Sequence, residues 1–579
     1  MGRRDRPGEA VSTLTPAQQA AIDAELKVAD GVGDRIAVTA GAGAGKTAVL
    51  TRRVARLISD GITPESILVV TFTRAAAAEM RARLATIVPS HRRLPEIRTL
   101  HSWCARFLRA NAELVNRTPS FSIYDEADVR DVLRVVAAEV GDDLGERFDA
   151  KRVLKNPAYR DRFVDRLRLG NALTYDQLER FAVKILAEND RVRDRVNARY
   201  RHVLVDEVQD LSEAQESLLG NLGRYNTTLF GVGDERQAIY SFRGGTPAVM
   251  ARLAAERSLV LPENFRSVSA IVDLANAVAG AGAHPMRPTR SDAGAVRLLE
   301  ADDEVQEAGR VLAQLRAWNA AGIPWSDMAV IGRTWSALEA FRSSFVGASP
   351  EVPHRYYGEQ ATDLWSTAEG RAVARLAGLA ENPADDNLAL LLAQHVGLDA
   401  RALAVAARRE RRTLLAKIAE QNPAWATVAG ATSIVGCSLL HEWIAGVSAG
   451  GLTSRAERYE AAATYVDRLG RESFLEWWTD RGVMDRKADA SDGVAILTAH
   501  AAKGLEWRAV AVVGADCYPM RAARTDEEIR EERRVLYVAL TRARDELLVS
   551  YPRRRVTPSG GTRSTSAPFL DGLEALWMP

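Results

Sequence analysis

The strongest chemical signal in the sequence lies between Val38 and Val54, in "VTAGAGAGKTAVLTRRV". An apolar run that predicts a strand ends at Val38, and a helix-like pattern starts at Lys46 and Thr47. Backbone N–H groups of a glycine-rich loop at a helix N-terminus bind phosphate groups. Lys46 adds a mobile positive charge, and the Thr47 hydroxyl suits Mg²⁺. The stretch therefore predicts a binding site for a nucleoside triphosphate and Mg²⁺.

The predicted phosphate-binding loop departs from the G-x-x-x-x-G-K-T pattern at one position, because Ala40 replaces the first glycine. Alanine is small enough to fit there. The residues expected to bind the nucleotide phosphates are Ala40, Gly41, Ala42, Gly43, Ala44, Gly45, Lys46 and Thr47.

A second apolar strand pattern ends in two carboxylates, in "RHVLVDEVQD". Asp206 is suited to hold Mg²⁺, and Glu207 is suited to accept a proton from the attacking water. Hydrolysis also requires positive charge beside the charge that develops on the phosphate. Arg266 in "LPENFRSVSA" and Arg542 in "RRVLYVALTRARDE" are the candidates, although an arginine considered alone is more often an ion-paired surface residue. Together with the loop, these groups predict nucleotide hydrolysis.

The elements that must position these residues follow from the alternation of strand and helix patterns. Short apolar strands ("DRIAVTAG", "SILVVTFT", "EIRTLHS") alternate with amphipathic helices in the N-terminal part of the chain. Residues 106–199 look helical and show no strand pattern, whereas strands return at "RHVLVDEVQD" and "TTLFGVGDERQ". A third α/β stretch includes "DMAVIGRT", and strands reappear after a helical block at about 387–487. This order predicts parallel sheets in two α/β lobes, each interrupted by a helical insertion.

Length and composition exclude several classes of protein. A chain of 579 residues is too long for one core, and its net charge of +1 argues neither for nor against a nucleic-acid partner. No apolar run approaches the length of a membrane span, and no apolar segment follows the charged N-terminus as in a secretory signal. The three cysteines, Cys104, Cys437 and Cys517, lack zinc-site or disulfide spacing. We therefore expect a multidomain cytoplasmic protein with no membrane partner.

The motifs resemble, in order, those of superfamily 1 helicases of the UvrD/PcrA/Rep type, a group that also includes RecB-like motors. The resemblance extends from Leu14 to Arg544, nearly the whole chain, and the number of ordered blocks makes it specific. The blocks are "LTPAQQAAI", "VVTFTRAAAAEMRARL", "RTLHSWCARFLR", "VDEVQDLSEAQ", "GVGDERQAIYSFRGG", "ENFRS", "LTAHAAKGLEW" and "EERRVLYVALTRAR".

The resemblance implies an α/β fold of two RecA-like motor lobes with parallel sheets, each carrying a mainly helical insertion. The implied ranges are 1–105 and 200–270 for lobe 1A, 106–199 for insertion 1B, 271–386 and 488–579 for lobe 2A, and 387–487 for a compact insertion 2B. ATP would bind between the lobes, so that binding closes the cleft and hydrolysis releases it.

The resemblance also assigns roles in nucleotide binding. Gln18 would read the adenine, Phe265 would stack on it, and Glu506 would lie near the ribose. Gln237 would sense the γ-phosphate and connect it to the DNA track. The two arginines named above would both reach the γ-phosphate.

The DNA track has its own set of residues. A motor that ignores base sequence needs aromatic side chains that stack on bases, together with phosphate contacts. The positions that resemble the family's DNA contacts are Thr71, Phe72, His101, Tyr240, Phe242, Arg243, Thr498 and His500. The aromatic positions among them would stack on bases, with Arg243 beside them, and the threonine and histidine positions would contact phosphates.

Several positions depart from the family pattern. Arg236 replaces the usual Asp before Gln237, Phe242 replaces the usual Trp, and Arg74-Ala75 replaces the common Asn-Lys. The second insertion is also short for a UvrD-type 2B subdomain. None of these departures removes a predicted catalytic group.

The residues and the resemblance together predict an ATP-dependent DNA helicase or translocase that moves 3′ to 5′ on single-stranded DNA, in repair or recombination. Its cofactors would be ATP and Mg²⁺, and its substrates single-stranded DNA and junctions of single and double strands. One alternative is a motor subunit of a nuclease complex in recombination or phage defence, with a nuclease or repair protein as partner. Another is an ATP-gated DNA-sensing module, which the retained Glu207 and Arg542 argue against, because sensing requires no hydrolysis.

Overall fold

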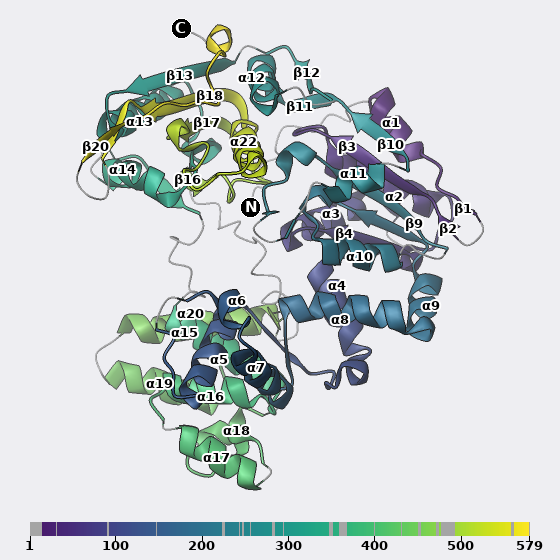
Figure 1. Cartoon of the computed structure of the whole chain (residues 1–579), viewed down its shortest axis with the longest axis vertical. Coiled ribbons are helices and arrows are strands. Elements are labelled where there is room, and N and C mark those ends of the chain that lie inside the picture. The colour runs from purple at the N-terminus through teal and green to yellow at the C-terminus, as the bar shows by residue number, and fades with distance from the viewer. Residues whose placement is uncertain are drawn as a thin grey trace, which may run out of the picture. The chain divides into compact units, whose positions relative to one another are not determined.

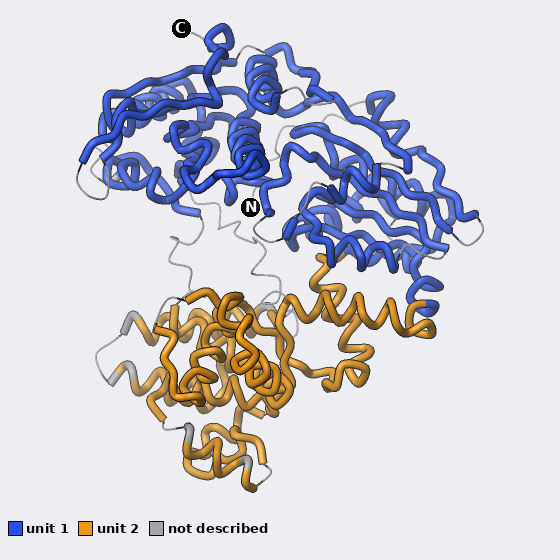
Figure 2. The backbone as a smooth tube through the Cα atoms, viewed as in Figure 1, with its two compact units in different colours: residues 1–97, 194–361, 486–579 blue, residues 98–193, 362–485 orange. Residues whose placement is uncertain are grey.

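The computed structural model divides the chain into two compact units. Unit 1 comprises residues 1–97, 194–361 and 486–579, and unit 2 comprises residues 98–193 and 362–485 (Figure 2). The residues that the structure describes are 14–29, 32–89, 92–145, 148–222, 226–241, 244–245, 248–254, 256–280, 284–292, 294–346, 351–357, 367–398, 400–410, 412–429, 431–449, 453–470, 474–475, 493–556 and 561–577.

The first sheet of unit 1 has the strand order β10-β3-β9-β8-β4-β5, of which β10, β3, β9 and β4 are labelled in Figure 1. Its strands are β3 (Arg35–Ala40), β4 (Ile67–Thr71), β5 (Glu96–Thr99), β8 (His202–Val205), β9 (Thr228–Gly233) and β10 (Ser258–Leu261). The pairs β10–β3, β3–β9, β9–β8 and β8–β4 are parallel. Every residue of β4 and β9 is buried, which explains why these strands appear in the sequence as unbroken apolar runs.

The first described helix of unit 1 starts at a residue that caps it. The side chain of Thr15 accepts a hydrogen bond from the Gln18 backbone N–H, and the Gln18 side chain accepts one from Thr15. This capping box, followed by Pro16, defines where α1 begins. The helices in this part of unit 1 are α1 (Pro16–Asp23), α2 (Lys46–Ser59), α3 (Arg74–Ile87), α10 (Glu213–Leu222) and α11 (Ala248–Ala254).

The second sheet of unit 1 has the strand order β13-β18-β17-β14-β16-β15, and all of its pairings are parallel. Its strands are β13 (Ala295–Ala301), β14 (Met328–Gly332), β15 (His354–Tyr356), β16 (Val494–Thr498), β17 (Trp507–Val513) and β18 (Ala543–Pro552). The accompanying helices are α12 (Ser269–Ala279), α13 (Glu304–Ala320), α14 (Trp335–Val346) and α22 (Asp526–Leu540). A short parallel pair, β11 (Glu263–Val268) and β12 (Arg287–Arg290), occupies the stretch of chain between the strands of the two sheets.

Unit 2 is mainly helical and is built from both insertions. The first insertion contributes α4 (Leu100–Arg109), α5 (Glu126–Glu139), α6 (Ala150–Val153), α7 (Pro157–Leu169) and α8 (Tyr175–Glu188). The second contributes α15 (Ala368–Glu381), α16 (Asp386–His395), α17 (Ala400–Glu410), α18 (Leu414–Ala419), α19 (Ser438–Ala449) and α20 (Thr453–Leu469). One hydrophobic core contains Leu133 and Phe163 from the first insertion together with Leu376, Trp425 and Tyr459 from the second.

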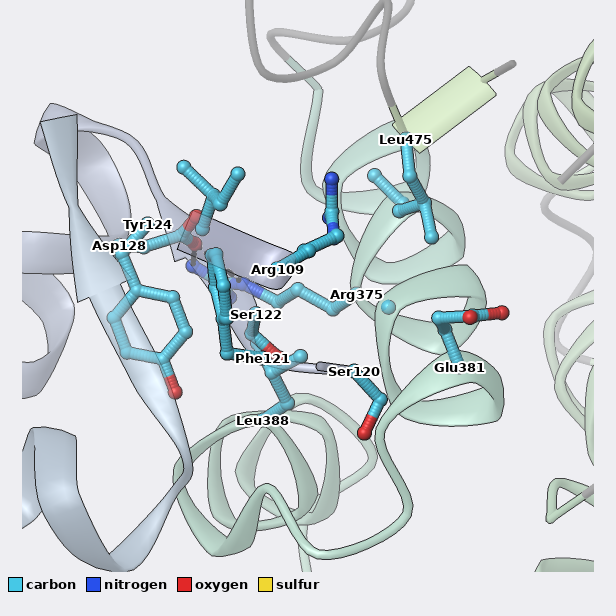
Figure 3. A pocket seen from close by; sticks show the side chains of 13 residues that line it. Arg109, Ser120, Phe121, Ser122, Tyr124, Asp128, Arg375, Glu381, Leu388 and Leu475 are labelled. Carbon is cyan, nitrogen blue, oxygen red and sulfur yellow. Dashed lines mark hydrogen bonds and ion pairs between the residues drawn. The ribbon is translucent and has the colours of Figure 1, made fainter. Parts of the chain in front are cut away.

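Polar contacts also join the two insertions inside unit 2. The Tyr124 hydroxyl donates a hydrogen bond of 2.5 Å to Asp385. Asp128 on α5 lies 2.8 Å from Arg371 and 3.0 Å from Arg375, both on α15. A pocket at this junction is lined from both sides, with Arg375 and Asp128 beside Tyr124 (Figure 3). The two insertions therefore form one packed body.

The expected fold class is confirmed, because the described residues contain two parallel sheets of six strands. The prediction that residues 106–199 contain no strand was wrong, since β6 (Ser122–Tyr124) pairs in parallel with β7 (Ala172–Thr174). Strands of three residues are too short to show an alternating pattern. The helix-rich part of the second insertion also starts earlier than the expected boundary of 386/387, with α15 capped by Thr367.

Candidate functional site

The phosphate-binding loop lies between β3 and α2, as the small residues predicted. Gly43 has φ of +70°, a left-handed conformation that favours glycine. A Cβ atom on Gly43 would lie 2.7 Å from the Cβ of Arg266, so a larger residue would also collide with the strand that packs on the loop. The Phe265 backbone N–H donates to the Gly43 carbonyl over 3.0 Å. The segment that contains Arg266 is thereby held directly against the loop.

Strand order brings the predicted catalytic groups to the same edge of the sheet. β9 lies between β3, which leads into the loop, and β8, which leads into Asp206 and Glu207. Parallel strands place their carboxyl ends at one edge, where ligands bind in open α/β sheets. Gln237 follows β9, and its side chain donates a 2.8 Å hydrogen bond to buried Asp234.

Lys46 and Glu207 form an ion pair, with 3.1 Å between Nζ and Oε2. Burial by itself would lower the pKa of Lys46, but the carboxylates of Glu207, Asp234 and Asp206 outweigh it and raise that pKa. Burial would raise the pKa of Glu207, but Lys46 and Lys503 lower it to about 2. The pair therefore keeps both groups charged inside a buried site.

The two predicted hydrolytic carboxylates have pKa values shifted in opposite directions, and Glu207 also has an uncommon backbone conformation. Burial and the neighbouring Glu207 raise the pKa of Asp206 to about 7. Glu207 has φ of +53°, which is uncommon for a residue with a side chain and costs on the order of 1–3 kcal/mol. Such strain is typical of functional positions. A divalent cation beside the buried Asp206 carboxyl would favour its ionised form, so Asp206, with the Thr47 hydroxyl at the start of α2, fits Mg²⁺.

The two predicted arginines reach this region from different elements. Arg266 on β11 pairs with Glu506, with 2.6 Å between Nε and Oε2, and donates to the Thr541 carbonyl over 3.2 Å. Arg542 is 1% exposed and donates to the carbonyls of Val538 (2.8 Å) and Leu505 (3.2 Å). Burial and the positive charge of Arg266 lower the pKa of Arg542 to about 9. Arg542 is thus a buried cation held by neutral acceptors.

The predicted adenine-side residues also meet the loop. Gln18 is buried, and its side-chain amide donates to the Ala44 carbonyl over 3.1 Å. Phe265 is 38% exposed, which is unusual for a large aromatic side chain and leaves ring surface available for stacking. Glu506 lies beside Arg266 in the ion pair described above.

The predicted DNA-track residues of unit 1 gather around one aromatic side chain. The rings of Phe72 and Tyr240 stack with centroids 5.2 Å apart and an interplanar angle of 15°. His500 lies 6.3 Å from Tyr240, and Thr498 ends β16 close by in sequence. Thr71 is buried, and its hydroxyl donates to the Thr73 carbonyl. Segments that follow β4, β9 and β16 therefore converge on Tyr240.

Of the three remaining predicted DNA contacts, the structure describes His101. His101 belongs to α4 of unit 2, where its Nε2 lies 2.9 Å from a carboxylate oxygen of Glu179. Its ring also meets Tyr175 edge-on, at 5.4 Å between centroids. Phe242 and Arg243 fall outside the described residues, so their predicted roles stay predictions.

Lys503 was missed by the sequence analysis, although it lies inside the quoted block "LTAHAAKGLEW". Its Nζ lies 2.7 Å from Asp210, 2.6 Å from the Gln237 carbonyl and 4.8 Å from the centre of the Tyr240 ring. The side chains of the ion pair are 7% and 0% exposed. The signal that could have identified Lys503 is its rarity, because it is one of eight lysines in a chain with 77 basic residues.

Two parallel-sheet lobes carry a phosphate-binding loop, a carboxylate pair at the end of a strand, and the buried Arg542 of the second lobe. These features define a P-loop nucleotide hydrolase. Family comparison identifies it further: the UvrD/REP helicase N-terminal domain matches residues 16–156 and 151–257, and the UvrD-like helicase C-terminal domain matches residues 473–554. The chain belongs to this helicase family, whose members are ATP-hydrolysing DNA helicases.

Individual relatives are similar over most of their length. The chain is 30% identical to the ATP-dependent DNA helicase UvrD1 of Mycobacterium bovis, over 93% of this chain and 82% of that protein. It is 27% identical to a probable DNA helicase II homolog of Mycoplasma capricolum, over 91% and 84%. It is 24% identical to the ATP-dependent DNA helicase PcrA of Staphylococcus aureus, over 90% and 81%.

Across the described part of the chain, helices fall short of the length and apolar character that a membrane span needs.

Proposed function

We propose that the protein hydrolyses ATP to move 3′ to 5′ along single-stranded DNA and to separate strands, in repair or recombination. One observation carries the proposal. Lys503 contacts Asp210, the Gln237 carbonyl and the Tyr240 ring, and so joins the predicted nucleotide site to the predicted DNA track. A motor needs such a connection, because hydrolysis must change the grip on DNA.

Binding of the triphosphate begins with an exchange of partners at Lys46. The phosphates compete with Glu207 for the Lys46 ammonium group, which lies 3.1 Å from the Glu207 carboxylate. Once Lys46 turns to the phosphates, the Glu207 carboxylate is released to accept a proton from water. Asp206 and Thr47 would hold Mg²⁺, which would supply charge neutralisation at the phosphates. Occupation of the site therefore prepares its own base.

The two arginines stabilise the charge that develops on the terminal phosphate. Arg542 is suited to this role because its charge is buried among neutral carbonyls and gains most from an anion. Arg266 exchanges its Glu506 partner for phosphate oxygen. Gln18 and Phe265 bind the adenine through the amide and the exposed ring.

The DNA half of the cycle depends on Phe72, Tyr240 and His500. Aromatic rings stack on bases without regard to sequence, at about 1–3 kcal/mol per base. Phe72 and Tyr240 stack on each other at 5.2 Å, so a base that enters must separate or replace that stack. Lys503 moves with Tyr240 because the ammonium group lies over the ring. Thr71, Thr498 and His101 contact phosphates, while Phe242 stacks on a base with Arg243 beside it.

The test is ATP hydrolysis by the purified full chain, with and without single-stranded DNA. Strong stimulation by DNA that is lost in Lys46→Ala would support the proposal. Tyr240→Ala should retain the rate without DNA and require about tenfold more DNA for half-maximal stimulation, as expected for the loss of one stacking contact. If DNA stimulates ATP hydrolysis, strand displacement is then measured on junctions with 3′ and 5′ single-stranded tails. The tail that supports displacement determines the direction of movement along DNA.

Slow hydrolysis that ignores DNA would contradict an autonomous motor. It would favour a subunit that requires a partner, such as a nuclease, and co-purification would then identify that partner. Stimulation by DNA without strand displacement on either junction would contradict unwinding while leaving translocation intact.

A further inference from the structure

Arg236 is a basic residue at a position where the related motifs have an acidic one. It lies in the short 3-10 helix η4 (Glu235–Gln237), directly after β9 and immediately before Gln237. Its side chain is 19% exposed, so it is neither a surface residue nor sealed in a core.

The guanidinium of Arg236 lies against the phosphate-binding loop. A Cβ atom on Gly41 would lie 2.9 Å from Nη2 of Arg236, so the group packs directly on the loop backbone. Its Nε donates to Asp234 over 3.1 Å, and its carbon centre lies 5.3 Å from the middle of the Tyr537 ring. Tyr537 in turn donates to Asp234 over 3.3 Å. Arg236 is therefore fixed by a buried carboxylate and an aromatic ring.

The position of Arg236 within the site indicates which phosphate it faces. β9 lies between the strand that leads into the loop and the strand that leads into Glu207. A base must face the terminal phosphate, since it directs the attacking water there. A side chain that starts between the loop and the base therefore approaches the terminal phosphate. A guanidinium carries five N–H donors, of which Asp234 receives the one on Nε.

We propose that Arg236 is a third arginine of the nucleotide site and binds the terminal phosphate of a nucleoside triphosphate. Asp234 and Tyr537 hold the guanidinium in place, and Gly41 leaves room for it beside the loop. The inference rests on the proposed ATP site and extends it. In the competing view Arg236 only balances the charge of Asp234.

The experiment compares the binding of fluorescent ATP and ADP analogues, each with Mg²⁺, to the full chain. All proteins carry Glu207→Gln, so that ATP survives the titration. Charge-assisted hydrogen bonds to phosphate are worth about 1.5–3 kcal/mol, which is about tenfold to a hundredfold in affinity. Arg236→Gln should therefore weaken ATP binding at least about tenfold and ADP binding less than about twofold. Arg236→Lys should restore part of the loss, because it keeps the charge.

Arg252→Gln is the matched control, since Arg252 is a half-exposed arginine of the same lobe that pairs with Glu216. It should change neither affinity. Equal losses of ATP and ADP affinity in Arg236→Gln, or no loss, would overturn the inference. A melting temperature measured for each variant separates misfolding from lost contacts. If Arg236→Gln unfolds, the affinities of Arg236→Lys for ATP and ADP still decide the test. If the protein binds ATP normally but DNA does not stimulate its ATP hydrolysis, only the proposed function is contradicted. If the protein with Arg236 intact binds no ATP, the proposed function and this inference are both overturned.

Discussion

Buried arginines in the two units show opposite electrostatic behaviour. In unit 1, burial and Arg266 lower the pKa of Arg542 to about 9, and its hydrogen bonds go to the carbonyls of Val538 and Leu505. In unit 2, burial alone would lower the pKa of Arg371, but Asp128 and Asp125 outweigh it and raise that pKa. Arg542 hydrogen-bonds to neutral acceptors, and the Glu506 and Glu207 carboxylates do not restore its pKa, whereas Arg371 is ion-paired with the carboxylates of Asp125 and Asp128.

We interpret the first environment as suited to an anion supplied by a ligand, and the second as an ion pair that holds structure together. A buried charge without a matching countercharge costs free energy until a ligand supplies one. The left-handed backbone of Glu207 is a second unfavourable feature of this region of unit 1, and such strain is typical of functional positions. The carboxylates of unit 2 join α5 to α15 and make one body of two insertions. Burial of a charged side chain therefore does not by itself indicate a functional site. The charges of the groups around that side chain must be considered as well.

The largest expected effect is at Glu207. We expect Glu207→Gln to lower kcat for ATP hydrolysis about 10³-fold, the scale of a lost general base. ATP should bind at least as tightly as in the parent, because the amide no longer competes for Lys46. Single-turnover hydrolysis and nucleotide titration measure the two effects. Near-normal turnover would show that another group accepts the proton.

The counterpart in unit 2 is Asp128→Ala, which removes the carboxylate that joins Arg371 to Arg375. Removing one partner of a buried ion pair costs about 3–5 kcal/mol. We expect that loss to appear as reduced hydrogen-exchange protection of α5 and α15, with kcat measured without DNA changed less than about twofold. Arg83→Ala, which breaks an exposed pair with Glu79, is the control and should cost about 0.5 kcal/mol or less. If Asp128→Ala instead lost ATP hydrolysis while the hydrogen-exchange protection of α5 and α15 stayed unchanged, the structural role assigned to this ion pair would be wrong.

The smallest effect, when taken over one pH unit, concerns Asp385, whose pKa burial raises to about 7. The folded protein then holds a proton on Asp385 that the unfolded chain releases near pH 4, so stability falls as pH rises from about 4 to about 7. The slope is at most about 1.4 kcal/mol per pH unit. Asp385→Asn accepts the same Tyr124 hydrogen bond and should remove this slope. Urea midpoints of both proteins over that range measure it, and parallel curves would contradict the assignment.

Much of the nucleotide site could be predicted because its chemistry is local in sequence. The loop from Ala40 to Thr47 needs consecutive small residues, and Asp206-Glu207 needs only a strand before it. Lys503 could not be found this way, since its partners Asp210 and Gln237 are far away in the chain and belong to the other lobe. The strands β6 and β7 escaped prediction because three residues carry too little pattern.

The sequence by itself determined the order of motifs and the buried parallel strands, and it predicted which groups bind the nucleotide, because consecutive residues and their periodicity encode these features. Only the tertiary structure decided which charges meet. In the tertiary structure Lys503 lies over the Tyr240 ring, Arg236 packs against Gly41, and the two insertions share one hydrophobic core. Such contacts arise from packing between distant segments, and no local pattern records them.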